Sequence, residues 1–153
     1  MPCIYVLIIA LFSSCKEKPH STAATHLAYD LLIDSANHLY DAGEPGNAIK
    51  YLNSVITNYQ DLSFNQKFDY CGMHYNYYFH IKKNTEKALY YADLLLKLSK
   101  TAKNNDDYVA AYSTAKFYKG DALFESNKYN EAYLNYYQGK LASSKSNKTQ
   151  DCT

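Results

Sequence analysis

Few residues of this chain occur at the spacing that catalysis or metal binding requires. The five histidines form no HExxH pair, and the chain has no GxxxxGK[ST], GxGxxG or GxSxG segment. Cys71 and His74 would share one helix face, but no second pair at metal-ligand spacing accompanies them. The carboxylate pair Asp106 and Asp107 is explained by a helix start. We therefore expect a protein that is not an enzyme and needs no metal or cofactor.

The basic residues argue against two further classes of function. All sixteen are lysines, and fifteen acidic residues bring the formal net charge to +1. Arginine is the side chain that forks onto phosphate, guanine or carboxylate groups. Its absence, together with the small net charge, argues against nucleic-acid binding and phosphoryl transfer.

The tyrosines are the residues best suited to recognition. The chain has 18 tyrosines and no tryptophan, and four of the tyrosines fall within residues 70–80. Tyrosine combines a large contact area with few rotatable bonds and a polar tip, so it is common at recognition surfaces. The alternative is that the rings fill space between packed helices, and we favour that explanation for Tyr75 and Phe79.

The length and composition predict one domain. The chain has 153 residues, of which 47% are apolar and 20% charged. A chain of this size buries about two-thirds of the surface that its unfolded form exposes, so a core can form without a metal or a disulfide framework. We expect the cysteines that remain in the helical region and the tail, Cys71 and Cys152, to be unpaired.

The first residues carry a targeting pattern. Nine consecutive apolar residues, 4–12, are followed by two serines and Cys15. Nine residues are too few to span a bilayer but have the length of a signal-peptide core. The segment resembles the lipobox of bacterial lipoproteins, which implies a signal peptide over residues 1–14, lipid on Cys15 and a polar tether over residues 15–25. The alternative, a buried N-terminal helix or strand, finds no nearby apolar segment to pair with.

The remaining chain predicts an all-α fold. Apolar residues recur at helical spacing from residue 25 to about 144, without sustained alternation of the strand kind. Glycine, proline and N-cap residues divide this region. Six helices are predicted, over residues 25–42, 46–59, 65–82, 85–103, 106–126 and 129–144.

The even-numbered helices of this set repeat one pattern. Each places an alanine near its start, namely Ala48, Ala88 and Ala132. Nine residues earlier stands a bulky apolar residue, namely Leu39, Phe79 and Leu123. Twelve residues earlier stand Ala36, Asn76 and Gly120. Small residues on both members of an antiparallel helix pair let the axes approach closely, so this pattern predicts helix hairpins.

This small, bulky, small pattern resembles the tetratricopeptide repeat family. The match is closest over residues 113–146, followed by 29–62. The middle unit departs from the family at Asn76, where a small residue is usual, and at Gly72, where a bulky one is. The resemblance implies a right-handed superhelical array of about three antiparallel hairpins over residues 26–146, followed by a disordered tail over 147–153.

In the family, one face of each first helix lines a concave groove for an extended peptide or a partner helix. Carried over by position, that face comprises Ile33, Asn37, Tyr40, Asp41, Tyr70, Met73, Tyr77, His80, Phe117, Asp121 and Phe124. From these we predict a partner-binding set of Asn37, Tyr40, Tyr70, Tyr77, His80, Asp121 and Phe124. Its mixed aromatic and amide character suits a peptide or protein partner better than a phosphate.

These observations predict a non-enzymatic protein-interaction scaffold that is lipid-anchored in the bacterial cell envelope. An uncapped last hairpin exposes its stacking side, so self-association through that hairpin is also expected. The alternative function is the sensory N-terminal segment of an envelope histidine kinase or transcriptional regulator. Glycan capture by a helical lipoprotein is a third class, although it favours a longer chain with tryptophan platforms.

Overall fold

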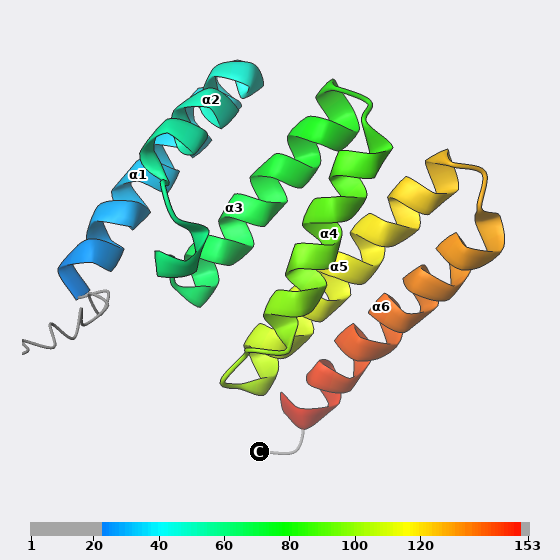
Figure 1. The fold of residues 1–153 in the computed structure, drawn as a ribbon. Helices are drawn as coiled ribbons and strands as arrows, with labels where there is room; N and C mark the ends of the chain where they lie inside the picture. Colours follow the sequence, from blue (N-terminus) through cyan, green and yellow to red (C-terminus); the bar gives the residue numbers. More distant parts are fainter. Residues whose placement is uncertain (1–22, 151–153) are drawn as a thin grey trace, which may run out of the picture.

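The computed structural model describes residues 23–150, and the side chains of residues 25–144. This part of the chain is all-α, as predicted, and has no sheet. Its helices pack as adjacent antiparallel pairs that follow one another across the molecule (Figure 1). The six α-helices are α1 (Ala23–Asp41), α2 (Pro45–Val55), α3 (Phe64–Asn76), α4 (Thr85–Ser99), α5 (Asn105–Glu125) and α6 (Tyr129–Gln150). The predicted signal peptide, Cys15 and residues 151–153 lie outside the described residues.

Four helix ends differ from the sequence prediction by more than two residues, and one of them is the end of α3, which lies at Asn76 instead of residue 82. Helix α2 stops at Val55, and the chain continues through an extended residue to a 3₁₀ turn over Tyr59–Asp61. Helix α4 stops at Ser99, earlier than the predicted residue 103. Helix α6 continues to Gln150, past the predicted end at residue 144 and into the segment predicted as a tail. No glycine or proline follows Gly139 to end α6.

Helix α3 continues directly into a π-helical segment over Tyr77–Ile81. There the Lys82 amide donates to the Tyr77 carbonyl oxygen at 3.0 Å, a separation of five residues. The wider turn shifts the register of the chain before the following helix begins. As a result, the Asn84 amide reaches the Tyr78 carbonyl oxygen at 2.8 Å.

The turn inside each hairpin contains one residue in the left-handed conformation. These residues are Gly43 (φ 84°), Lys83 (φ 52°) and Asn127 (φ 58°), and each stands five residues before a repeated alanine. The first and third turns close with the same backbone bond, from Glu44 to Leu39 (3.0 Å) and from Lys128 to Leu123 (2.9 Å). Such bonds satisfy carbonyl groups at a helix end. The sequence repeat is therefore also a repeat of turn geometry.

The repeated alanines lie in the core. Ala48 and Ala88 are fully buried and Ala132 is 1% exposed. In the third hairpin the close approach involves Gly120 of α5 and the Tyr136 ring of α6, since a Cβ atom on Gly120 would collide with that ring. Tyr136 also donates a hydrogen bond from its hydroxyl to Asp121 at 2.7 Å. Position 120 is therefore restricted to glycine by a neighbouring side chain.

Buried Gln66 joins the first hairpin to the second. Its side-chain amide donates to the His26 carbonyl oxygen and to the Asp30 carboxylate of α1, both at 2.6 Å. Its carbonyl oxygen accepts from the Ser63 amide at 2.9 Å, which completes a capping box at the start of α3. The Gln66 side chain thus caps the start of α3 and also fixes the position of α3 against α1.

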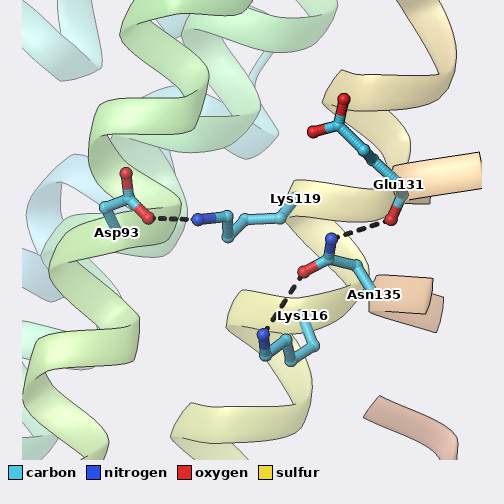
Figure 2. Close-up of polar contacts among 5 residues, drawn as sticks. All are labelled: Asp93, Lys116, Lys119, Glu131 and Asn135. Carbon is cyan, nitrogen blue, oxygen red and sulfur yellow. Dashed lines mark hydrogen bonds and ion pairs between the residues drawn. The ribbon is translucent and has the colours of Figure 1, made fainter. Parts of the chain in front are cut away.

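Polar contacts also link the later helices (Figure 2). Lys119 of α5 forms an ion pair with Asp93 of α4, at 2.6 Å. One turn earlier, the Lys116 ammonium lies 3.4 Å from the Asn135 side-chain oxygen of α6. Helix α5 therefore contacts a helix on either side of it through lysine side chains.

We expect Gly120→Ala to destabilise the protein by about 1–3 kcal/mol, because the added methyl group overpacks the crossing against the Tyr136 ring. Gly72→Ala is the matched control, since its Cβ atom would meet only the Tyr118 hydroxyl, at 3.8 Å. That control is expected to be neutral or to stabilise by up to about 1 kcal/mol through helix propensity. Urea unfolding of both variants measures the difference, and equal midpoints would contradict the close crossing.

Candidate functional site

The first helices of the three hairpins together line one depression of about 380 Å³. Helix α1 contributes Asn37, Tyr40 and Asp41, and helix α5 contributes Tyr118. Helix α3 forms the remaining wall with Phe68, Asp69, Gly72, Met73 and Asn76. Two members of the predicted binding set, Asn37 and Tyr40, therefore lie together in one concave site.

Contacts between α3 and α5 fix one side of this depression. The rings of Tyr75 and Tyr118 are stacked, with centroids 3.7 Å apart and planes inclined by 2°. The Tyr75 hydroxyl donates to the Tyr118 carbonyl oxygen at 2.9 Å. Burial raises the pKa of the Tyr118 hydroxyl, and the Asn76 side chain opposes this shift. Because Tyr75 is 1% exposed, this stack is a fixed support for the Tyr118 ring.

The depression carries negative charge. Asp41 and Asp69 belong to its lining, and none of its described lining residues is a lysine. Burial raises the pKa of the Asp69 carboxyl, and the carboxylates of Asp34 and Asp30 raise it further. An added positive charge nearby would stabilise the ionised form of Asp69. The depression thus combines two carboxylates with the rings of Tyr40, Phe68 and Tyr118.

The other predicted residues of the second hairpin lie elsewhere. Tyr70 packs between hairpins, with its ring 4.1 Å from the His74 ring and its hydroxyl bonded to Asn53 of α2 at 3.2 Å. Tyr77 packs against the core of the first hairpin. His80 is exposed and meets the Phe79 ring edge-on, at 4.9 Å between centroids. None of the three is among the residues that line the depression.

The predicted residues of the third hairpin are also separate from the depression. Asp121 accepts the Tyr136 hydrogen bond inside the hairpin. Phe124 is 53% exposed and packs against Tyr129 at the turn between α5 and α6. The predicted set is therefore divided over at least three places on the molecule.

Sequence reasoning missed five lining residues, but two of them, Gly72 and Asn76, stand where the sequence departs from the repeat pattern. Gly72 stands where the repeat family usually has a bulky side chain, and the missing side chain leaves space between α1 and α3. Phe68 and Asn76 are four residues to either side of Gly72, so they share its helix face. A hollow could therefore have been expected at this departure from the pattern.

A second polar cluster lies around buried His74. Its Nδ1 donates to the Tyr70 carbonyl oxygen at 2.9 Å, and its Nε2 lies 2.9 Å from the Asn53 side-chain oxygen. Its ring lies between those of Tyr70 and Tyr91, with centroids at 4.1 and 4.6 Å. Burial lowers the pKa of His74 to about 4, although the hydrogen bond to Tyr70 opposes this shift. His74 is thus a neutral core residue at pH 7.

Cys71 is also a buried core residue. It is fully buried, forms no disulfide with a described residue, and its sulfur lies 3.5 Å from the Tyr59 hydroxyl. Burial raises the pKa of the Cys71 thiol to about 11. The described residues contain no group of three histidine, cysteine or acidic side chains arranged to hold a metal ion.

Comparisons with protein-family models, with curated proteins and with solved structures found no match. Among the described residues, none of the helices has the length and apolar character needed to cross a bilayer.

We expect acid to destabilise the fold through His74. The folded-state pKa of about 4 lies below the ordinary value of 6.5, so the unfolded chain binds the proton more tightly. The stability that neutral His74 contributes is present above pH 6.5 and is lost as the pH falls towards 4, by about 3 kcal/mol in total.

Urea unfolding between pH 7 and pH 4 measures this loss in the native protein and in His74→Gln. The variant is expected to lose less stability over the same range, whatever its stability at pH 7. His38→Gln, at an exposed position, controls for the removal of one histidine. Parallel pH profiles for His74→Gln and the native protein would contradict the assignment.

Proposed function

We propose that this protein is a non-enzymatic scaffold that holds a segment of another protein in the depression between α1, α3 and α5. Its hairpins then form a right-handed superhelical array of the tetratricopeptide type. The observation that supports this proposal most directly is the convergence of the three first helices on one concave site. In the resembled family, the same face of the first helices holds a peptide or a partner helix.

The lining of the depression indicates the chemistry of the bound segment. Tyr40 and Tyr118 offer ring surface, and Met73 adds an adaptable apolar side chain. Asp41 and Asp69 supply carboxylates at the same site. A lysine or arginine side chain matches both features, because its apolar stem packs on rings while its charged end reaches a carboxylate. We propose a basic peptide segment as the occupant.

The proposed location is the bacterial cell envelope, with lipid on Cys15 as the anchor. The segment from Cys15 to residue 25 is polar and carries Pro19, which suits a tether. More than one acyl chain on a single cysteine holds a soluble domain stably at a membrane surface, since each buried methylene contributes about 0.8 kcal/mol. The helical domain would then present its depression to partners near that surface.

We expect peptides selected from a random display library on the immobilised protein to be enriched in lysine and arginine next to apolar residues. Their affinity is expected to fall about tenfold or more on Tyr40→Ala, as is typical when a contact aromatic is removed. Asp41→Lys is expected to weaken binding by a similar factor, and added salt to weaken it further. Titration by isothermal calorimetry measures each affinity.

Tyr90→Ala is the matched control, because Tyr90 is an exposed tyrosine of α4 that is not part of the depression. Its peptide affinity is expected to equal that of the native protein. Thermal unfolding of all three variants separates lost binding from lost folding. Selected peptides without basic residues, or equal losses for Tyr40→Ala and Tyr90→Ala, would refute the proposed site.

We expect the mature protein to begin at a lipid-modified Cys15. The reason is the nine-residue apolar run that ends in two serines and this cysteine. Mass spectrometry of the membrane fraction of a bacterial expression host measures the N-terminus, and Cys15→Ser is expected to leave the protein unlipidated. An intact N-terminal peptide that starts at Met1, in a native protein that sediments with membranes, would be incompatible with this processing.

A further inference from the structure

The outer face of α6 carries an exposed apolar stripe. Tyr133 is 71% exposed, Tyr137 54% and Leu141 42%, and Leu134 beside them is 53% exposed. Tyr133, Tyr137 and Leu141 follow one another at intervals of four residues, and Leu134 is three residues before Tyr137, so the four side chains lie along one side of the helix. The opposite side of α6 packs on α5 through Ala132, Tyr136 and Gly139. Within the described residues, Tyr133, Leu134 and Tyr137 thus have no partner helix, whereas Leu141 also borders a depression that Tyr108 and Tyr112 of α5 line.

The repeat register indicates what position 137 does in the other hairpins. Asn53, Asp93 and Tyr137 each stand five residues after a repeated alanine. Asn53 of α2 contacts His74 and Tyr70 of α3, the first helix of the next hairpin. Asp93 of α4 forms its ion pair with Lys119 of α5, again the next hairpin (Figure 2). The position that joins one hairpin to the next is therefore an exposed tyrosine in α6.

Three of the four stripe residues are arranged symmetrically about Tyr137, and the fourth, Leu134, has Lys140 as its mirror position. Apolar residues stand four positions to either side, at Tyr133 and Leu141, and polar residues stand seven positions to either side, at Asn130 and Ser144. When two such helices pair antiparallel about Tyr137, each Tyr133 meets Leu141 of the other copy and polar residues meet at both ends. A second copy of the same face is therefore complementary to the first, as a twofold interface requires.

The available area matches a small dimer. A large aromatic side chain presents about 150–250 Å², so the exposed parts of the four stripe residues amount to about 400 Å² per copy. Two copies would bury about 800 Å², an area typical of weak and transient interfaces. Tyrosine is also among the residues that are enriched at such interfaces, and Lys140 is the one charge inside the stripe.

We propose that the α6 face is a self-association surface on which a second copy of this chain packs antiparallel, with the two Tyr137 side chains at the twofold axis. This surface lies on a different helix from the peptide-binding depression, so the two proposals fail or hold independently. The association is reversible and weak, because the area is small.

Sedimentation equilibrium of the full chain, from about 1 to about 100 μM, tests the proposal. The native protein is expected to form dimers within this range. Tyr137→Glu places two negative charges at the axis and is expected to raise the dimer dissociation constant about tenfold or more. Tyr90→Glu, at an exposed tyrosine of α4, is expected to change it less than about twofold.

A second pair of variants tests the register. In the antiparallel arrangement Leu134, three positions before Tyr137, lies opposite Lys140 of the second copy, three positions after it. Leu134→Glu is therefore expected to dimerise about fivefold more tightly than Leu134→Lys, because one pairing attracts and the other repels. Circular dichroism of all variants checks that the helices are retained.

Three outcomes would overturn the proposal. A native protein that stays monomeric up to about 100 μM would mean that another occupant, such as a further hairpin or a different protein, covers this face. Association that Tyr137→Glu leaves unchanged would place the contact on another segment of the chain. Equal dimerisation of the Leu134→Glu and Leu134→Lys variants would overturn the antiparallel register.

Discussion

Two helices can approach closely only where a small side chain separates their axes, and the rest of this fold depends on that condition. Each hairpin meets it with a buried alanine five residues after a left-handed turn residue. In the third hairpin Gly120 of α5 also has no side chain, and this leaves room for the Tyr136 ring of α6. Because the turn and the crossing are set by residues close in sequence, each hairpin is a local unit. The tyrosines can then fill the wider spaces between units.

Both the Tyr75–Tyr118 stack and the polar cluster around His74 lie in those spaces between hairpins. A buried tyrosine hydroxyl needs a partner, so the rings lie where a backbone carbonyl or an amide is within reach. The Tyr75 hydroxyl donates to the Tyr118 carbonyl oxygen, and the stack of the two rings supports one wall of the depression. The Tyr70 hydroxyl donates to the Asn53 side-chain oxygen, and the His74 ring contacts the same oxygen. The depression remains open because Gly72 has no side chain to fill it.

The sequence was sufficient to predict six helices and their pairing, because helical periodicity and turn residues are local signals. Successive repeated alanines are 40 and 44 residues apart, and the extra four residues amount to about one helical turn, which preserves the packed faces. The site was less predictable. Tyr70 is two residues from both Phe68 and Gly72, so it points away from the wall that they form. Tyr77 follows Met73 by four residues, but the π segment begins there and ends the regular helical spacing. The site also needs residues that are far apart in the sequence to line one depression, such as Gly72 and Tyr118, 46 residues apart, and no local pattern encodes such a pairing.

The burial of Cys71 has a consequence for the motions of this protein. A thiol that is fully enclosed and held in its protonated form reacts with a modifying reagent only after the surrounding structure opens. The labelling rate at this one sulfur therefore reports how often the middle hairpin separates from its neighbours. When reclosing is faster than modification, that rate gives the free energy of the opening step. Labelling of Cys71 thus measures fluctuations of the middle hairpin in the native sequence, with no introduced cysteine.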